Sequence, residues 1–264
     1  TFYRLFNCPI AAMIEVKNIH KTFGENHVLQ GISAEFKAGM CNLIIGGSGS
    51  GKTTLLKCMV GLHEPEKGSV IYDSRDFTSM NFRSRIEIRT EIGMLFQGSA
   101  LFDSMNVEDN IMFPINMFTN QNQKEKLERA NFCLERVNLA GTNKLFPAEL
   151  SGGMKKRVGI ARAIAMNPKY LFVDEPNSGL DPKTAIVIDE LIQEITEEFK
   201  TTTVVVTHDM NSVMGIGENI IFLHQGKKWW EGSNKEIIEA NNAELNEFVF
   251  ANKFMQALKK QNIG

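Results

Sequence analysis

The stretch that decides the fold of this chain reads Gly46-Gly47-Ser48-Gly49-Ser50-Gly51-Lys52-Thr53. It satisfies the pattern G-x-x-x-x-G-K-[ST], in which glycines let backbone N–H groups converge on phosphate oxygens. Lys52 adds a positive charge for the β- and γ-phosphates, and the Thr53 hydroxyl is a ligand for Mg²⁺. Together with the following Thr54, these residues predict a site for the phosphates of a nucleotide.

The residues on either side of this loop supply the context that the pattern requires. An apolar run at residues 41–45 predicts a strand directly before the loop. After the loop, apolar residues recur with the spacing of one helix face at Leu55, Leu56, Met59 and Val60. This helix is expected to end near Gly61. Strand, glycine-rich loop and helix in this order bring the positive end of the helix to the phosphates.

Further strands and helices are predicted outward from the loop. Strands are expected before it at residues 14–16 and 28–36. After residue 151 we predict a buried strand, an amphipathic helix, a β-branched strand and a hairpin, at residues 170–173, 188–199, 202–207 and 219–230. The segment from about 98 to 148 lacks strand runs but contains a polar helix candidate at 123–137. The chain is therefore expected to be an α/β protein with an inserted helical subdomain.

Two acidic residues follow the strand predicted at residues 170–173. In a parallel α/β sheet, ligands lie outside the carboxyl ends of the strands. Adjacent residues point in opposite directions, so we expect Asp174 in the Mg²⁺ shell and Glu175 positioning and deprotonating the attacking water. The alternative, that the two acids only cap the next helix, leaves the other motifs unexplained.

Composition excludes several other classes of protein. With 264 residues, 43% of them hydrophobic, the chain is long enough to bury a substantial core. Its net charge of -2 argues against non-specific attraction to nucleic acid. Four separated cysteines, none in a C-x-x-C pair, suggest buried thiols rather than a zinc site or a redox dithiol. No apolar stretch approaches the ~18 residues of a membrane span, so a membrane role needs a partner chain.

The segment Leu150-Ser151-Gly152-Gly153-Met154 resembles the ABC signature L-S-G-G-Q, with Met154 in place of the glutamine. Other motifs follow in that family's order: Phe23 at the adenine-stacking position, Gln97 in the glutamine loop, Ser178-Gly179-Leu180-Asp181 in the D-loop, and His208 after a strand. The chain therefore resembles the ATP-binding subunits of ABC transporters over residues 13 to about 231.

This resemblance implies a P-loop NTPase (RecA-like) core with a small antiparallel β-subdomain and an inserted α-helical subdomain at about 98–157. The ABC ATPase domain would span 13–231, and 232–264 would be a C-terminal helical extension. Residues 1–12 are expected to be an upstream segment, non-native or disordered, because Met13 opens the first strand pattern. The family also pairs two copies head to tail, with two ATP molecules between them.

The resemblance further implies a role for each matching residue. Catalysis would depend on Glu175, His208, Gln97 and Lys52. Mg²⁺ would be bound by Thr53, Gln97 and Asp174. ATP would be bound by Phe23, Gly46, Gly47, Ser48, Gly49, Ser50, Gly51, Lys52, Thr53, Thr54, Ser151, Gly152, Gly153 and Asp181. Phe23, Asn177 and Gly179 depart from the commoner tyrosine, threonine and alanine, but none of these changes removes a catalytic group. Lys155, Lys156 and Arg157 are expected on a solvated face rather than in contact with phosphate.

The run from Ile92 to Asn110, together with Met154, resembles the ATPase subunits of the Mla/Mce-type phospholipid transporters, the MlaF-like branch. That resemblance implies a peripheral protein at the cytoplasmic face of a bacterial inner membrane. Its partners would be an MlaE-like integral membrane permease and, indirectly, a periplasmic Mce-domain lipid-binding protein, without nucleic acid. The alternatives are an ABC regulator of a membrane partner, of the cell-division type, and a transporter of another small substrate.

Each of two apolar segments can be interpreted in two ways. Leu101 and Phe102 belong either to a groove for the permease or to the core of the helical subdomain. A second group, Leu245, Phe248, Phe254 and Leu258, either strengthens the dimer or packs on its own domain.

Overall fold

The structure is a computed structural model that describes residues 13–251. Its main sheet contains β3 (Cys41–Ile45), β6 (Ile92–Leu95), β7 (Tyr170–Asp174), β8 (Thr202–Val206), β9 (Asn219–His224) and β10 (Lys227–Gly232). A smaller antiparallel sheet contains β1 (Ile14–Phe23), β2 (Asn26–Phe36), β4 (Lys67–Tyr72) and β5 (Arg75–Asp76). The strand orders are β10-β9-β3-β8-β7-β6 and β2-β1-β4-β5. All neighbouring strands of the main sheet are parallel except the β9–β10 hairpin.

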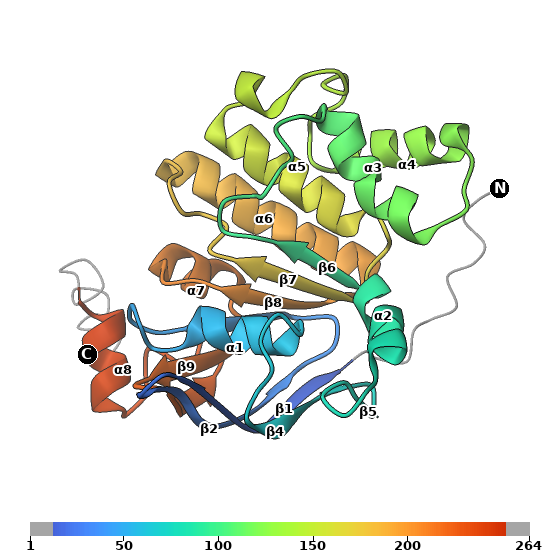
Figure 1. Cartoon of the computed structure of the whole chain (residues 1–264). Helices are drawn as coiled ribbons and strands as arrows, with labels where there is room; N and C mark the ends of the chain where they lie inside the picture. Colours follow the sequence, from blue (N-terminus) through green and yellow to red (C-terminus); the bar gives the residue numbers. More distant parts are fainter. Residues whose placement is uncertain (1–12, 252–264) are drawn as a thin grey trace.

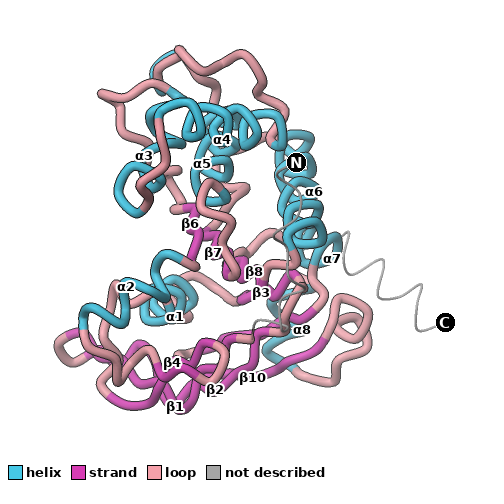
Figure 2. Tube along the Cα trace, turned by 90° about the vertical axis from the view of Figure 1, so that its right-hand side faces the viewer, coloured by secondary structure: helices cyan, strands magenta, loops and turns pink. Residues whose placement is uncertain are grey.

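Helices lie on both faces of the main sheet. They are α1 (Lys52–Met59), α2 (Phe82–Thr90), α3 (Val107–Phe118), α4 (Gln123–Arg136), α5 (Gly152–Ile164), α6 (Pro182–Phe199), α7 (Met210–Ile216) and α8 (Ala243–Val249), with a short 3₁₀ helix η1 at Pro147–Glu149. Figure 1 shows α1 between the two sheets, and Figure 2 shows α3 to α6 on the opposite side of the main sheet. This is the predicted α/β architecture with an antiparallel subdomain and added helices.

The central strands are buried on both faces, which explains their continuous apolar character. Successive side chains of a strand point to opposite faces. Leu43 and Ile45 therefore enter a core shared with α5 and α6, whereas Ile44 enters a second core. That second core contains Leu55 and Leu56 of α1 together with residues of the small sheet. The apolar face predicted for α1 is thus the face that packs in this second core.

The helices beyond the main sheet begin at residues that cap them. Asn122 accepts a hydrogen bond from the Glu125 N–H at 3.0 Å, and the Glu125 carboxylate accepts one from the Asn122 N–H at 2.8 Å, forming a capping box at the start of α4. Asn106 caps α3 in the same way through its side chain. The predicted end of the helical subdomain, residue 157, falls within α5, which continues to Ile164. A subdomain of residues 98–157 would therefore contain only the first part of that helix.

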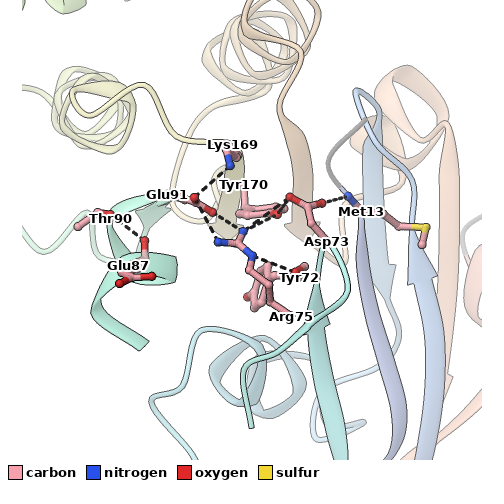
Figure 3. A network of polar contacts seen from close by, with 9 residues as sticks. All are labelled: Met13, Tyr72, Asp73, Arg75, Glu87, Thr90, Glu91, Lys169 and Tyr170. Carbon is pink, nitrogen blue, oxygen red and sulfur yellow. Dashed lines mark hydrogen bonds and ion pairs between the residues drawn. The ribbon is translucent and has the colours of Figure 1, made fainter. Parts of the chain in front are cut away.

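A network of polar contacts joins the small sheet to the main sheet (Figure 3). Arg75, in β5, donates two hydrogen bonds to the Glu91 carboxylate, at 2.6 and 3.3 Å. Lys169 donates to the same carboxylate at 3.0 Å. The Tyr170 hydroxyl, on β7, donates to Asp73 at 2.5 Å. Charge-assisted hydrogen bonds therefore hold the turn before β5 against the first residue of β7.

The C-terminal part of the described chain packs on its own domain. Leu245 is fully buried in the core shared with α5 and α6. The ring of Phe248 lies 5.5 Å from that of Phe222 on β9, centroid to centroid. For these residues the structure favours the self-packing interpretation, while Phe254 and Leu258, like residues 1–12, lie outside the described residues.

Three of the four cysteines lie within the described residues, and all three are buried. Burial raises the pKa of Cys41 to about 12 and the pKa values of Cys58 and Cys133 to about 11. These three therefore match the expected inert thiols. Among residues 13–251, no helix has the length and apolar character that a membrane span requires.

We predict that Tyr170→Phe lowers the free energy of unfolding by about 1–3 kcal/mol, because it removes the hydroxyl donor to the Asp73 carboxylate while keeping the ring. Urea denaturation measures this difference. Lys17→Met, which breaks the exposed Lys17–Glu15 pair, is the control and should cost about 1 kcal/mol or less. Equal losses in the two variants would contradict the assigned role of the network.

Candidate functional site

The glycine-rich loop leaves β3 and enters α1, as predicted. Gly46 has φ +149°, and a Cβ at this position would lie 2.2 Å from the Leu223 carbonyl oxygen. Gly51 has φ +102° and directly precedes α1. Only glycine fits both the backbone angle and the space at these two positions. By contrast, a Cβ at Gly47 or Gly49 would meet nothing within 4 Å, so this part of the loop is open.

Lys52 is held over the loop that precedes it. Its ammonium donates hydrogen bonds to the carbonyl oxygens of Gly46 at 2.9 Å and Gly47 at 3.0 Å. Burial lowers the pKa of Lys52, and the negative charges of Glu175 and Asp174 raise it. The positive charge is therefore positioned at the open part of the loop before any ligand arrives.

The two acidic residues at the end of β7, Asp174 within the strand and Glu175 directly after it, have different partners, as expected from their opposite directions. Asp174 accepts a hydrogen bond from the Thr53 hydroxyl at 3.2 Å. Burial raises the pKa of Asp174, while the Thr53 hydrogen bond lowers it. The Glu175 carboxylate instead lies 2.8 Å from Nδ1 of His208, in the loop after β8. The structure thus brings together Thr53 with Asp174, and Glu175 with His208.

Gln97 and Phe23 are exposed at the ends of their strands. Gln97 follows β6, and its carbonyl oxygen accepts a hydrogen bond from the Lys156 ammonium. The same ammonium donates to the Glu175 carbonyl oxygen at 3.2 Å, so one side chain bonds the backbone of both Gln97 and Glu175. Phe23 is 45% exposed, with His63 edge-on at 5.2 Å and the Lys21 ammonium 5.3 Å from its ring centre. Its ring therefore has free surface available for stacking.

The signature-like residues lie apart from the glycine-rich loop. Ser151 caps α5 by accepting a hydrogen bond from the Met154 N–H at 3.3 Å. Ser151 and Gly152 are exposed. In the described part of the chain, no hydrogen bond or ion pair joins residues 151–153 to residues 46–54. Asp181, also predicted to bind nucleotide, caps α6 by accepting from the N–H groups of Lys183 and Thr184, both at 3.1 Å.

The expectation of a solvated face at residues 155–157 is wrong for Lys156. This side chain is only 5% exposed and bonds the two carbonyl oxygens described above. Arg157 is half-buried and donates to the carbonyl oxygens of Val137 and Asn138, at 3.3 and 3.2 Å. Helical spacing is the signal that could have revealed this from the sequence, because Lys156 shares a face with Gly153 and Ile160, both of which are buried.

Asn177, noted from sequence only as a departure, lies in a buried polar cluster. Its amide group donates to the Asp189 carboxylate and to the Ser212 hydroxyl, both at 2.9 Å. Burial raises the pKa of Asp189 to about 6, against the hydrogen bonds from Ser212 and Asn177, which lower it. Asn177 therefore links the segment after Glu175 to α6 and to α7, the helix after His208.

Leu101 and Phe102 fit different interpretations: one belongs to the chain's own core and the other offers surface for a partner. Leu101 packs against the core shared with α5 and α6. Phe102 is 40% exposed, and its ring lies 4.6 Å from that of Phe113 and 5.9 Å from the Arg162 guanidinium. Leu101 therefore belongs to the chain's own core, whereas Phe102 presents apolar surface.

Comparison with known proteins places these features in a family. Residues 29–178 match the family model described as ABC transporter. The chain is 38% identical over 259 residues to the methionine import ATP-binding protein MetN of Campylobacter jejuni, covering 92% of this chain and 77% of that one. It is 35% identical over 237 residues to the intermembrane phospholipid transport system ATP-binding protein MlaF of Haemophilus influenzae, covering 90% of each.

A third relative and a solved structure extend the comparison. The probable ribonucleotide transport ATP-binding protein mkl of Mycobacterium leprae is 35% identical over 241 residues, covering 91% of this chain and 70% of that one. The dimeric structure of MJ0796, described as a bacterial ABC transporter cassette, superposes with a TM-score of 0.78 at 34% identity. The match covers 84% of this chain and 98% of that chain.

Proposed function

The chain belongs to the ABC transporter ATP-binding family, and from this premise we propose that it works as one half of a dimer that clasps two ATP molecules and drives phospholipid transport by a membrane permease. The family implies that the protein is an ATPase. The observation that carries the site assignment is that the glycine-rich loop after β3 meets the acidic end of β7, where the Thr53 hydroxyl, next to Lys52, donates to Asp174 at 3.2 Å.

The residues of the site fit Mg-ATP. The open loop at Gly47 and Gly49 leaves room for phosphate oxygens, and the Ser50 hydroxyl is buried without a partner among the described residues. Thr53 and Asp174 present two oxygen ligands 3.2 Å apart, of the hard type that Mg²⁺ prefers. Gln97 is the third proposed ligand. When bound, Mg²⁺ supplies charge neutralisation at the β- and γ-phosphates.

The remaining proposed ATP contacts come from four segments, two in the same copy and two in the other copy. Phe23 stacks on the adenine, and Ser48, Gly51 and Thr54 continue the phosphate loop around Lys52. From the other copy, Ser151, Gly152, Gly153 and Asp181 complete the nucleotide site.

In the proposed reaction, Glu175 orients and deprotonates the water that attacks the γ-phosphate. His208, 2.8 Å from the Glu175 carboxylate, holds that carboxylate in place through Nδ1. Lys52 leaves its two loop carbonyls for the phosphates and balances the negative charge that develops there. Glu175 therefore acts on the attacking water and Lys52 on the phosphates, while His208 acts through Glu175.

The exposed start of α5 supports a shared site. A helix N-terminus with a serine hydroxyl attracts anions, yet residues 151–153 make no polar contact with the loop of their own chain among the described residues. The proposed solution is a head-to-tail dimer in which Ser151 of one copy faces the γ-phosphate bound by the other. The dimeric structure of the MJ0796 cassette supports a dimer of two such chains.

The phospholipid assignment rests on the run from Ile92 to Asn110 and on Met154, with MlaF of Haemophilus influenzae as supporting relative. The proposed partners are an MlaE-like permease and, through it, a periplasmic Mce-domain lipid-binding protein, with the ATPase peripheral at the cytoplasmic face of a bacterial inner membrane. Phe102 and, at the end of α3, Met117 and Phe118 are exposed and offer apolar surface for the permease. The 38% identity to MetN makes methionine import the second candidate.

We predict that Glu175→Gln retains ATP binding but lowers kcat for ATP hydrolysis by about 10²–10⁴-fold, the usual effect of losing a general base. Phosphate release at saturating Mg-ATP measures kcat, and a labelled-ATP titration measures binding. Glu190→Gln, on the exposed face of α6, is the control and should leave both unchanged. Undiminished turnover in Glu175→Gln would refute the assignment of the base.

We predict that Lys52→Ala and Ser151→Ala complement each other when placed in opposite copies of the dimer. With one substitution in each copy, both defects fall on one nucleotide site and the second stays intact, so about half of the wild-type hydrolysis remains. With both substitutions in one copy, each site carries one defect and activity falls well below half.

Differently tagged copies, purified as mixed dimers, allow both arrangements to be measured. Sites contained within single chains would give the reverse order of activities. That outcome would contradict the shared site without affecting the assignment of Glu175.

We predict that the chain copurifies with an integral membrane permease and that anionic or zwitterionic phospholipid stimulates ATP hydrolysis by this complex in detergent. Methionine at millimolar concentration is the matched alternative substrate. Stimulation by methionine and not by phospholipid would contradict lipid transport and support the second candidate.

A further inference from the structure

The helix that begins at Ser151 also contacts the catalytic end of its own chain. Lys156 lies on the buried face of α5, five residues after Ser151, and is 5% exposed. Its ammonium donates hydrogen bonds to the carbonyl oxygen of Gln97 and, at 3.2 Å, to that of Glu175. One side chain of α5 therefore touches the backbone of two residues proposed to act on the γ-phosphate.

A second cation of α5 holds the same loop further along. Arg162 donates to the carbonyl oxygens of Ser99 and Ala100, both at 2.7 Å. Ser99 and Ala100 have positive φ, +63° and +47°, a region that residues with a Cβ enter only when their surroundings impose it. Gly159, between the two cations, has no room for a Cβ, which would lie 2.5 Å from Leu95 at the end of β6. The loop that carries Gln97 is thus held against α5 by hydrogen bonds from Lys156 and Arg162.

A buried ammonium persists only when donors and charge are both satisfied. Two carbonyl oxygens accept from Lys156, and the negative charges of Asp174 and Glu175 raise its pKa against the lowering caused by burial. The negative charges of the same two carboxylates also raise the pKa of Lys52. An apolar side chain would fill the same space without the free-energy cost of burying a charge. The hydrogen bonds that the Lys156 ammonium donates are therefore the property that requires an explanation.

Resting on the function proposed above, we infer that Lys156 is a positioning residue: its hydrogen bonds to the Gln97 and Glu175 carbonyls set the places of the Mg²⁺-binding amide and of the base. It acts through these two residues and does not itself touch nucleotide. Because Ser151 belongs to the same helix, Lys156 also connects the helix start that serves one nucleotide site with the catalytic groups of the other.

The experiment compares Lys156→Met, which keeps the length and apolar stem but removes every donor, with Lys156→Gln, which keeps an N–H donor group without the charge. Arg157→Met is the matched control, since it removes a neighbouring cation that bonds carbonyl oxygens within the helical part of the chain. Each full-length variant is assayed alone and with the membrane partner. The measurements are kcat, labelled-ATP stoichiometry and hydrogen exchange of the backbone amides of residues 98–100.

For Lys156→Met we expect one ATP bound per chain, unchanged affinity within about threefold, and kcat lowered by about 10–100-fold, because a displacement near 1 Å in catalytic groups has effects of this size. Exchange at residues 98–100 should be faster. Lys156→Gln should recover kcat to within about threefold of wild type, and Arg157→Met should leave kcat and exchange unaltered.

A Lys156→Met chain that binds ATP fully and keeps kcat within twofold of wild type overturns the inference. So does an equal loss of kcat in Lys156→Gln, because the donors would then not be the cause. If Lys156→Met fails to bind one ATP per chain, Lys156→Ala, whose smaller side chain admits water to both carbonyls, is judged by the same limits. Absence of hydrolysis in the wild type would contradict the proposed function instead.

Discussion

The structure depends on the parallel pairing of three buried strands, because that pairing decides what meets at their carboxyl ends. Val206 of β8 pairs with Ile44 of β3 on one side and with Asp174 of β7 on the other. The next residues along each strand are therefore level with one another: the glycine-rich loop, Glu175 and the segment leading to His208. A shift of any one strand would separate the Glu175 carboxylate from His208 or Asp174 from Thr53.

Charge is balanced around these strand ends by pairs of opposite sign. The negative charges of Asp174 and Glu175 raise the pKa values of two buried lysines, Lys52 from α1 and Lys156 from α5, against the lowering caused by burial. Each ammonium also bonds two backbone carbonyls, so none of the four groups is left buried without compensation. For the site proposed above, this means that the charged groups are already paired, which limits the reorganisation required when charge develops on a phosphate.

The similarity of this chain to ATP-binding proteins does not identify the compound that is transported. Relatives named for methionine import, for ribonucleotide transport and for phospholipid transport are all 35–38% identical to it. These relatives are named for different transported compounds but all as ATP-binding proteins, so their similarity supports the ATPase family and does not favour one transported compound. Phospholipid as the substrate therefore rests on narrower sequence features, Met154 and the run that begins at Ile92.

The sequence by itself determined the fold class, the phosphate loop and the paired acids, because those signals are local: a strand, a glycine pattern and a helix adjoin along the chain. It also placed β7, β8 and the β9–β10 hairpin correctly from apolar runs and turn residues. Only the tertiary structure decided the partners of Lys156 and Asn177, which lie far apart in sequence from the residues they bond. Charge alone suggested a solvated Lys156, but burial depends on what packs over a helix face, and that is settled only when Gln97 and Glu175 are brought to α5 by the sheet.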